Sequence, residues 1–81
     1  MEKYLNEFSI GESGVVSKIT AEGKIKRRLF DMGVTPGAAV TLKKVAPLGD
    51  PIQVLIRGYD LTLRRDEASK VLMEVAKWSL H

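Results

Sequence analysis

The sequence predicts a mainly β fold of about five short strands, with one α-helix inserted between the first two. Short runs in which apolar and β-branched residues alternate with polar ones are typical of half-buried strands. One stretch, about residues 20–32, instead has apolar residues at helical spacing. Glycine and proline residues separate these segments and indicate tight turns. In a chain of 81 residues, this pattern favours one domain that closes as a small barrel.

The helix is expected to run over about residues 20–32. Thr20 is a suitable N-cap, and Glu22 falls in the first turn, where the helix dipole favours an acidic side chain. Gly23 costs about 1 kcal/mol relative to alanine in a helix, so the start can lie one or two residues after Thr20. Gly33 can take the left-handed conformation that ends a helix. The apolar stripe expected to face the core is Ile25, Leu29 and Met32.

Strands are expected on both sides of this helix. The first is 15–19, and a helical turn at 65–69 precedes a last strand over 71–75. The alternative for that last segment is a short helix over 68–78, but its β-branched content favours a strand. The middle strands are expected at 38–45, 52–57 and 61–63, with turns formed by Gly33, Pro36, Gly37, Gly49, Pro51 and Gly58. The expected core is Val16, Ile25, Met32, Val40, Ile52, Val54, Ile56, Leu61, Leu63 and Val71.

An inserted helix after the first strand of a small barrel fits an SH3-like β-barrel best. The alternative is an OB-fold, which usually needs longer strands and more residues. The whole chain, residues 1–81, is expected to form this single domain. Whether the tail at 76–81 is flexible is left open, and its Trp78 and Leu80 favour weak self-association.

Composition excludes several classes of chemistry. The chain has no cysteine and a single histidine, His81, which excludes thiolate nucleophiles, histidine-based zinc sites and catalytic triads. The acidic residues that would hold a hard metal ion are scattered along the sequence, and there is no glycine-rich phosphate loop. The sequence therefore predicts no catalytic residues, no metal site and no cofactor.

Charge and hydropathy limit the kinds of partner. The chain has 13 basic and 10 acidic residues and a net charge of +3, which permits an acidic partner without requiring one. Aromatic and basic residues are not interleaved along one segment, so no nucleic-acid binding is expected. No segment has the roughly 20 apolar residues that cross a bilayer, and the N-terminus lacks the apolar core of a signal peptide. A cytoplasmic protein without direct membrane insertion is expected.

Four segments form one ordered pattern. They are RLFDMGVTPG at residues 28–37, APLGDPI at 46–52, RGYDLTLR at 57–64 and DEA at 66–68. In order and spacing the pattern resembles the ferrous iron transport protein A (FeoA) family from the helix to the last strand. With Gly11 and the two valines at 15 and 16, the resemblance covers nearly the whole chain, although the tail goes beyond the usual end of the domain.

The resemblance implies an SH3-like β-barrel with an inserted helix. It also implies a small cytoplasmic accessory of FeoB, a membrane-embedded ferrous iron transporter with a GTP-binding domain. Such an accessory would dock on the cytoplasmic face of FeoB and affect its assembly, gating or GTP turnover. The resemblance associates the chain with transition metal ion binding through the family alone, and it assigns no site residues to this sequence. The same domain type forms the C-terminal part of metal-responsive repressors of the diphtheria toxin repressor type. The alternatives are therefore a stand-alone regulatory module related to those C-terminal domains and a nucleic-acid-binding barrel.

The helix carries most of the candidate partner-binding residues. Phe30 falls roughly opposite the core stripe, near Lys26; the alternative is that Phe30 packs under the N-terminal segment. An exposed Phe30, or Leu29 at the rim of the stripe, would suit an apolar partner surface with acidic groups around it, because Lys26 and Arg27 flank them. Leu48, in the loop between the second and third strands, is a further candidate.

Overall fold

The computed structural model describes residues 1–75. Within them the backbone forms six strands, two short α-helices and one 3-10 turn. The tail at 76–81, and with it the self-association expected of Trp78 and Leu80, lies outside the described residues. In chain order the elements are β1 (Glu2–Tyr4), the 3-10 turn η1 (Leu5–Glu7), β2 (Ser13–Ile19), α1 (Gly23–Asp31), β3 (Ala39–Val45), β4 (Ile52–Ile56), β5 (Tyr59–Leu63), α2 (Arg65–Ala68) and β6 (Val71–Glu74).

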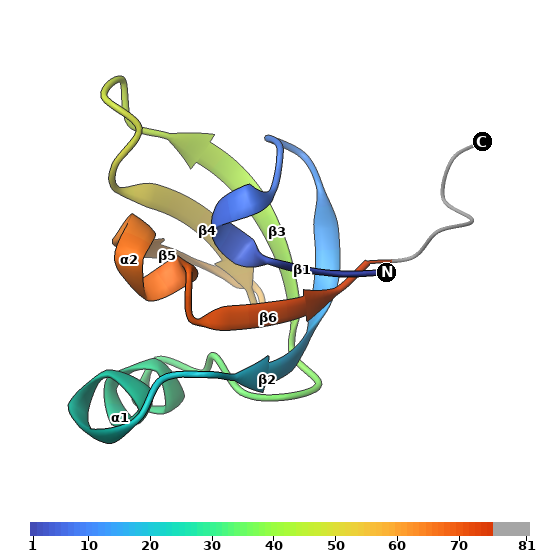
Figure 1. Cartoon of the computed structure of the whole chain (residues 1–81). Helices are drawn as coiled ribbons and strands as arrows, with labels where there is room; N and C mark the ends of the chain where they lie inside the picture. Colours follow the sequence, from blue (N-terminus) through green and yellow to red (C-terminus); the bar gives the residue numbers. More distant parts are fainter. Residues whose placement is uncertain (76–81) are drawn as a thin grey trace.

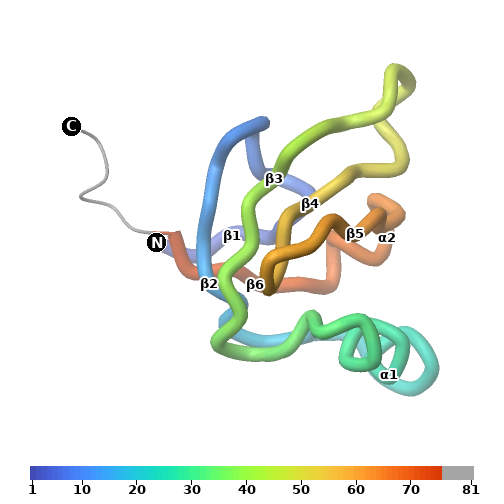
Figure 2. The backbone as a smooth tube through the Cα atoms, turned by 180° about the vertical axis from the view of Figure 1, so that it is seen from behind, coloured from blue at the N-terminus to red at the C-terminus, as the bar shows by residue number. Residues whose placement is uncertain are grey.

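These six strands belong to one antiparallel sheet in the order β1-β6-β2-β3-β4-β5. The sheet curls around a common interior, as Figure 1 and Figure 2 show from opposite sides. The register shifts between Val16 and Lys18 on β2 and between Leu42 and Lys44 on β3, and such bulges bend a strand and increase its twist. The mainly β fold with an inserted helix is confirmed, and the segment before the tail is a strand rather than a helix.

The core lies on the inner face of the curled sheet. Pairing sets buried residues opposite one another, with Val40 facing Ile56 and Leu42 facing Val54, because alternate side chains of each strand point to the same face. Of the predicted core residues, the structure buries Val16, Val40, Ile52, Val54, Ile56, Leu63 and Val71 and partly buries Met32 and Leu61.

The helix begins later than predicted and leaves Ile25 exposed. Glu22, not Thr20, is the N-cap; the N–H and Oγ1 of Thr20 both donate to the carbonyl of Lys70, at 2.7 and 3.2 Å. Ile25 therefore lies in the first turn of a helix that projects from the barrel (Figure 1), and 40% of it is exposed. The prediction that Ile25 is a core residue is wrong, because helical spacing shows which side chains share a face but not how far the helix extends past the core.

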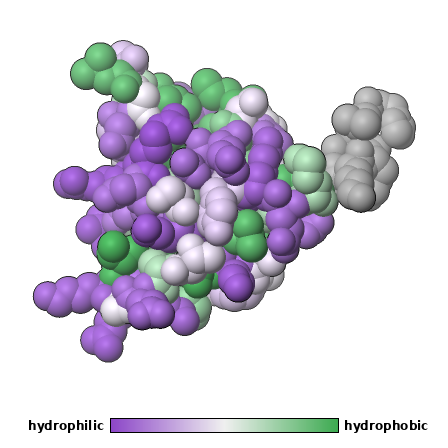
Figure 3. Space-filling model, in the orientation of Figure 1, coloured by the Kyte–Doolittle hydropathy of each residue, from purple (hydrophilic) through white to green (hydrophobic). Residues whose placement is uncertain are grey.

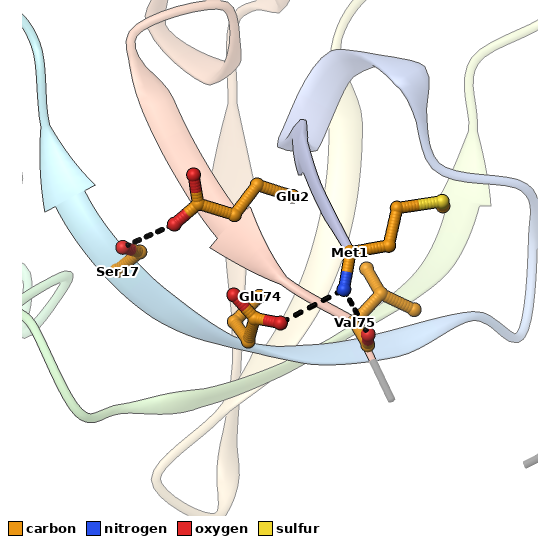
Figure 4. A network of polar contacts seen from close by, with 5 residues as sticks. All are labelled: Met1, Glu2, Ser17, Glu74 and Val75. Atoms are coloured by element: carbon orange, nitrogen blue, oxygen red, sulfur yellow. Dashed lines mark hydrogen bonds and ion pairs between the residues drawn. The ribbon is translucent and has the colours of Figure 1, made fainter. Parts of the chain in front are cut away.

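Polar contacts hold the short N-terminal strand β1, which the sequence pattern did not predict. It pairs with β6. The Met1 ammonium donates to Glu74 Oε2 at 2.9 Å and to the carbonyl of Val75 at 3.1 Å, and Ser17 Oγ donates to Glu2 Oε2 at 3.0 Å (Figure 4). The N-terminal segment is therefore tied to both β6 and β2.

The predicted turn residues all lie between elements, and the peptide bond before Pro51 is cis. The hairpin turn between β4 and β5 consists of Arg57 and Gly58, so Arg57 belongs to the turn and not, as expected, to the strand before it. Gly33, Pro36 and Gly37 connect α1 to β3, and Gly49 and Pro51 lie between β3 and β4.

Candidate docking site on helix α1

Helix α1 presents a positively charged surface at one end of the barrel. It projects beyond the sheet in both backbone views (Figure 1, Figure 2). Hydrophilic side chains reach outward at this end of the molecule, beside small apolar areas (Figure 3). The helix has nine residues, of which one, Asp31, is acidic, and its charged side chains are all exposed. The basic residues are Lys24, Lys26, Arg27 and Arg28.

Phe30 is the exposed aromatic residue of this helix. Its side chain is 40% exposed, and Nζ of Lys26, one turn earlier, lies 5.7 Å from the centroid of its ring. At that distance a cation is attracted to the face of an aromatic ring. This exposure contradicts the alternative in which Phe30 packs under the N-terminal segment. An exposed ring flanked by cations can enter an apolar pocket surrounded by acidic groups.

Leu29 is not available to a partner. Its exposure is 0%, and its carbonyl accepts a hydrogen bond from the N–H of Val34 at 2.9 Å. The prediction that Leu29 stays at the rim as a partner-binding residue is therefore wrong. Leu29 belongs to the buried core cluster and anchors the helix to the barrel.

A buried carboxylate links α1 to α2. Nε of Arg28 lies 3.2 Å from Oε2 of Glu67, and Glu67 is only 6% exposed. Oε1 of Glu67 accepts a hydrogen bond from the N–H of Arg64 at 2.9 Å. A buried charge is tolerated when it is paired and hydrogen-bonded. Glu67 therefore caps the start of α2 and pairs with an arginine in the last turn of α1.

Leu48 belongs to a separate surface. It is 96% exposed on the loop between β3 and β4, which lies at the opposite end of the barrel from α1 (Figure 1). Arg65 holds this loop: its Nε donates to the carbonyl of Gly49 at 2.8 Å and its N–H to Oδ1 of Asp50 at 3.0 Å. The structure therefore does not bring Leu48 together with Phe30, whereas Lys26, Arg27 and Phe30 share one helix.

The described residues contain few features that would hold a small ligand. No group of three or more His, Cys, Asp or Glu within residues 1–75 is placed to hold a metal ion. A hollow of about 270 Å³ lies beside the loop between β3 and β4, and its lining combines apolar residues such as Val45 and Pro47 with polar ones such as Gln53 and Thr62. No helix in this part of the chain is long and apolar enough to cross a membrane.

Two further residues, one in the turn between β4 and β5 and one at the start of β5, bond to the chain just after α1, and the sequence did not point to them. Arg57 and Tyr59 donate hydrogen bonds to the segment that follows the helix. The signal that could have found them is an arginine in a two-residue hairpin turn, a position that usually takes Asn, Asp or Gly.

The curled sheet and its inserted helix define a small SH3-like barrel. A zinc complex of FeoA from Stenotrophomonas maltophilia, described as a prokaryotic SH3 domain protein, is similar to the chain, with 29% identity, a TM-score of 0.78 and 89% of each chain covered. The model of the FeoA domain matches residues 3–75. The chain belongs to the FeoA family, and the resemblance in the sequence is confirmed.

Other relatives extend this comparison. The NMR structure of a FeoA-like protein from Clostridium acetobutylicum is 39% identical, with a TM-score of 0.89, over 99% of this chain and 93% of that one. The Fe(2+) transport protein A/Fe(2+) transporter FeoB fusion protein of Porphyromonas gingivalis is 32% identical over 71 residues, 88% of this chain. The chain spans only 8% of the length of that relative.

A structure of lower sequence identity also shares the fold. IdeR from T. acidophilum is 21% identical to the chain, with a TM-score of 0.83, over 93% of this chain and 34% of that one. At this level of identity, the similarity shows the fold alone.

Proposed function

We propose that the chain is a non-enzymatic, cytoplasmic accessory of ferrous iron uptake, which docks on a FeoB-type transporter and modulates its assembly, gating or GTP turnover. The observation that carries this proposal is the Porphyromonas gingivalis relative, which joins Fe(2+) transport protein A and the FeoB transporter in one polypeptide. Two parts made as a single chain are produced together and stay together. A separate chain of the same family needs a docking surface to reach the same arrangement.

Helix α1 is the docking surface in this proposal. Phe30 enters an apolar pocket on the cytoplasmic side of the transporter, and Lys26 and Arg27 face acidic groups around that pocket. Aromatic and arginine side chains contribute most of the binding energy in many interfaces. Complementary charge around them raises the rate of association and selects the orientation of the partner. The exposure of Phe30 and the excess of basic residues on α1 support this assignment.

The proposal is tested by titrating the isotope-labelled chain with the GTP-binding portion of FeoB from the same organism, with and without nucleotide. We expect NMR shift changes in α1 and the neighbouring turn. We also expect Phe30→Ala to weaken binding about thirtyfold or more, because truncating a buried aromatic anchor costs about 2 kcal/mol or more. Raising the salt concentration should weaken binding further, because it screens the charges of Lys26 and Arg27.

Ile10→Ala is the matched control. Ile10 is 65% exposed in the connection between η1 and β2, so its truncation removes similar apolar area elsewhere on the surface. Wild-type affinity in Ile10→Ala and weak binding in Phe30→Ala would support docking through α1. Equal affinity of both variants and the wild type would contradict it, and so would shift changes confined to other elements.

A further inference from the structure

Residues in and next to the turn between β4 and β5 donate hydrogen bonds to the segment that follows α1. Nε of Arg57 donates to the carbonyl of Gly33 at 3.2 Å, and Nη2 of Arg57 donates to Oγ1 of Thr35 at 2.7 Å. The hydroxyl of Tyr59 donates to the carbonyl of Met32 at 3.1 Å. These three hydrogen bonds join elements that are more than 20 residues apart in the chain. We call them the hairpin clasp.

The backbone of Arg57 gives a reason to assign its side chain a role. Arg57 has a φ of 51°, and within residues 1–75 it is the one non-glycine residue with a positive φ. It is the first residue of the two-residue turn between Ile56 and Tyr59, where Asn, Asp or Gly fits with less strain. The conformation of the turn therefore does not explain why this residue is an arginine. The two hydrogen bonds that its side chain donates to Gly33 and Thr35 do explain it.

The residues of the hairpin clasp lie against Gly33, which has no side chain. Gly33 has a φ of 90°, and a Cβ atom placed on it would lie 3.1 Å from the hydroxyl of Tyr59 and 3.5 Å from Cδ and Nε of Arg57. A side chain at this position would therefore displace the Tyr59 hydroxyl by a few tenths of an ångström, away from the end of the helix. The glycine serves both the conformation of the chain after the helix and the close approach of the turn.

Few other contacts fix the direction of α1. Leu29 is its one buried residue, so it acts as an anchor near the end of the helix. The ion pair between Arg28 and Glu67 involves an arginine side chain that is 59% exposed. One apolar anchor leaves a helix free to rotate about it unless contacts elsewhere prevent this. The hairpin clasp supplies such contacts at the C-terminal end of the helix.

We propose that Arg57 and Tyr59 are positioning residues for partner binding: they hold α1 in the orientation in which Phe30, Lys26 and Arg27 meet the partner together. This inference rests on the proposed function, because it assigns the purpose of the clasp to docking through α1. The clasp is exposed, and exposed polar contacts add little to global stability. We therefore expect the hairpin clasp to affect the orientation of α1 more than the global stability of the protein.

Arg57→Asn and Tyr59→Phe, singly and together, test this inference in the full chain. Asparagine favours the positive φ of the turn but is too short to reach Gly33 and Thr35, so we expect a melting temperature equal to or above that of the wild type. Tyr59→Phe keeps the ring and removes one hydrogen bond. Lys43→Asn, at an exposed position on β3, is the control for charge and for the introduced residue.

Two readouts separate positioning from a merely structural role. Residual dipolar couplings of the α1 amides, measured against those of the sheet, report the orientation of the helix without any partner. We expect the double variant to change the couplings of α1 and leave those of the strands as in the wild type. Affinity for the GTP-binding portion of FeoB should fall about two- to tenfold per variant, which corresponds to the net contribution of one or two hydrogen bonds.

The outcomes distinguish failure of this inference from failure of the proposed function. Unchanged α1 couplings in the double variant overturn the positioning role, and so does wild-type affinity when Phe30→Ala binds weakly. A lower melting temperature with unchanged α1 couplings also overturns it, because the clasp would then be a stabilising contact only. If Phe30→Ala binds as the wild type does, the proposed docking through α1 fails, and the positioning role in docking fails with it. Changed couplings would then show only that the clasp orients the helix.

Discussion

Gly33 illustrates how much one position decides in this small domain. Its φ of 90° lies in the left-handed region, and its missing side chain makes room for the hydroxyl of Tyr59. Its carbonyl also accepts the hydrogen bond from Nε of Arg57. Gly33 therefore allows α1 to end, leaves room for the close approach of Tyr59, and accepts a hydrogen bond from Arg57. No other amino acid meets the first two demands at once.

Gly33→Ala is expected to destabilise the protein by roughly 2 kcal/mol, because backbone strain and displacement of the Tyr59 hydroxyl add together. Gly37→Ala is the matched control: Gly37 has a φ of 94°, but an added Cβ meets nothing within 4 Å. Its cost should be the strain alone, about 1 kcal/mol. Urea unfolding measures both values. Equal destabilisation by the two substitutions would mean that the contact with Tyr59 and Arg57 contributes nothing.

At the scale of the element, α1 is secured from its C-terminal half. Its N-cap, Glu22, makes no side-chain hydrogen bond to the helix, and the first turn carries no acidic residue. The first N–H groups of the helix are therefore left to solvent. The buried anchor Leu29 and the hairpin clasp lie at the other end. We expect the first turn, with Ile25, to open more often than the last.

Glu22→Ser should slow amide exchange in the first turn of α1 about fivefold, because a serine at the N-cap accepts a hydrogen bond worth about 1 kcal/mol from the helix. Exchange in the strands should stay as it is. Glu22→Ala provides the comparison, since it removes the carboxylate without supplying an acceptor. Identical exchange in the serine and alanine variants would show that the missing cap does not limit the first turn.

The distance along the chain between interacting residues decides how much of the whole molecule the sequence predicts. Strands β3, β4 and β6 follow from alternation within each segment. Strand β1 has only three residues, and its place depends on pairing with β6 at the other end of the described chain. Such pairing leaves no local pattern in a segment so short. The late start of α1 has a similar cause, because contacts with the rest of the barrel decide where the helix begins.

The candidate site also has a part that the sequence predicts and a part that it does not. Helical spacing groups Lys26 with Phe30, and the structure places Nζ of Lys26 near the ring. The depth of Leu29 in the core, and the distance of Leu48 from α1, depend on how the sheet curls. The same holds for the hairpin clasp of Arg57 and Tyr59, whose partners are more than 20 residues away.

Stability at acidic pH depends on how the N-terminal segment is attached to the barrel. Glu12 accepts a hydrogen bond from the N–H of Ser9 at 2.8 Å, and its Oε2 lies 2.8 Å from Nζ of Lys3. Burial alone would raise the pKa of Glu12, but the hydrogen bonds from Lys3 and Ser9, together with the charge of Lys3, hold this pKa below its ordinary value of 4.5. Folding therefore favours the ionised form of Glu12.

The sign of the pH effect follows from this lowered pKa. The stabilisation from Glu12 should be complete above about pH 4.5, the unfolded value, and should be lost as the pH falls through the lower pKa of the folded state. Unfolding by urea between pH 3 and 7 measures it for the wild type and Glu12→Gln. We expect the wild type to be more stable near neutral pH, by less than about 1 kcal/mol, and the difference to shrink in acid. A difference that does not depend on pH would contradict this account.

The pairing of β1 with β6 also decides where a covalently attached protein would sit. The N–H of Val75 donates to the carbonyl of Met1 at 2.7 Å, so both ends of the described barrel meet on one side, away from α1 (Figure 1). A tether to either end would leave Phe30 and the basic side chains of the helix unobstructed. A short flexible tether gives an effective concentration of about a millimolar. An α1 surface of weak affinity would then be occupied most of the time in a fused polypeptide, whereas a domain of this kind without such a tether would reach occupancy by abundance or by tighter binding.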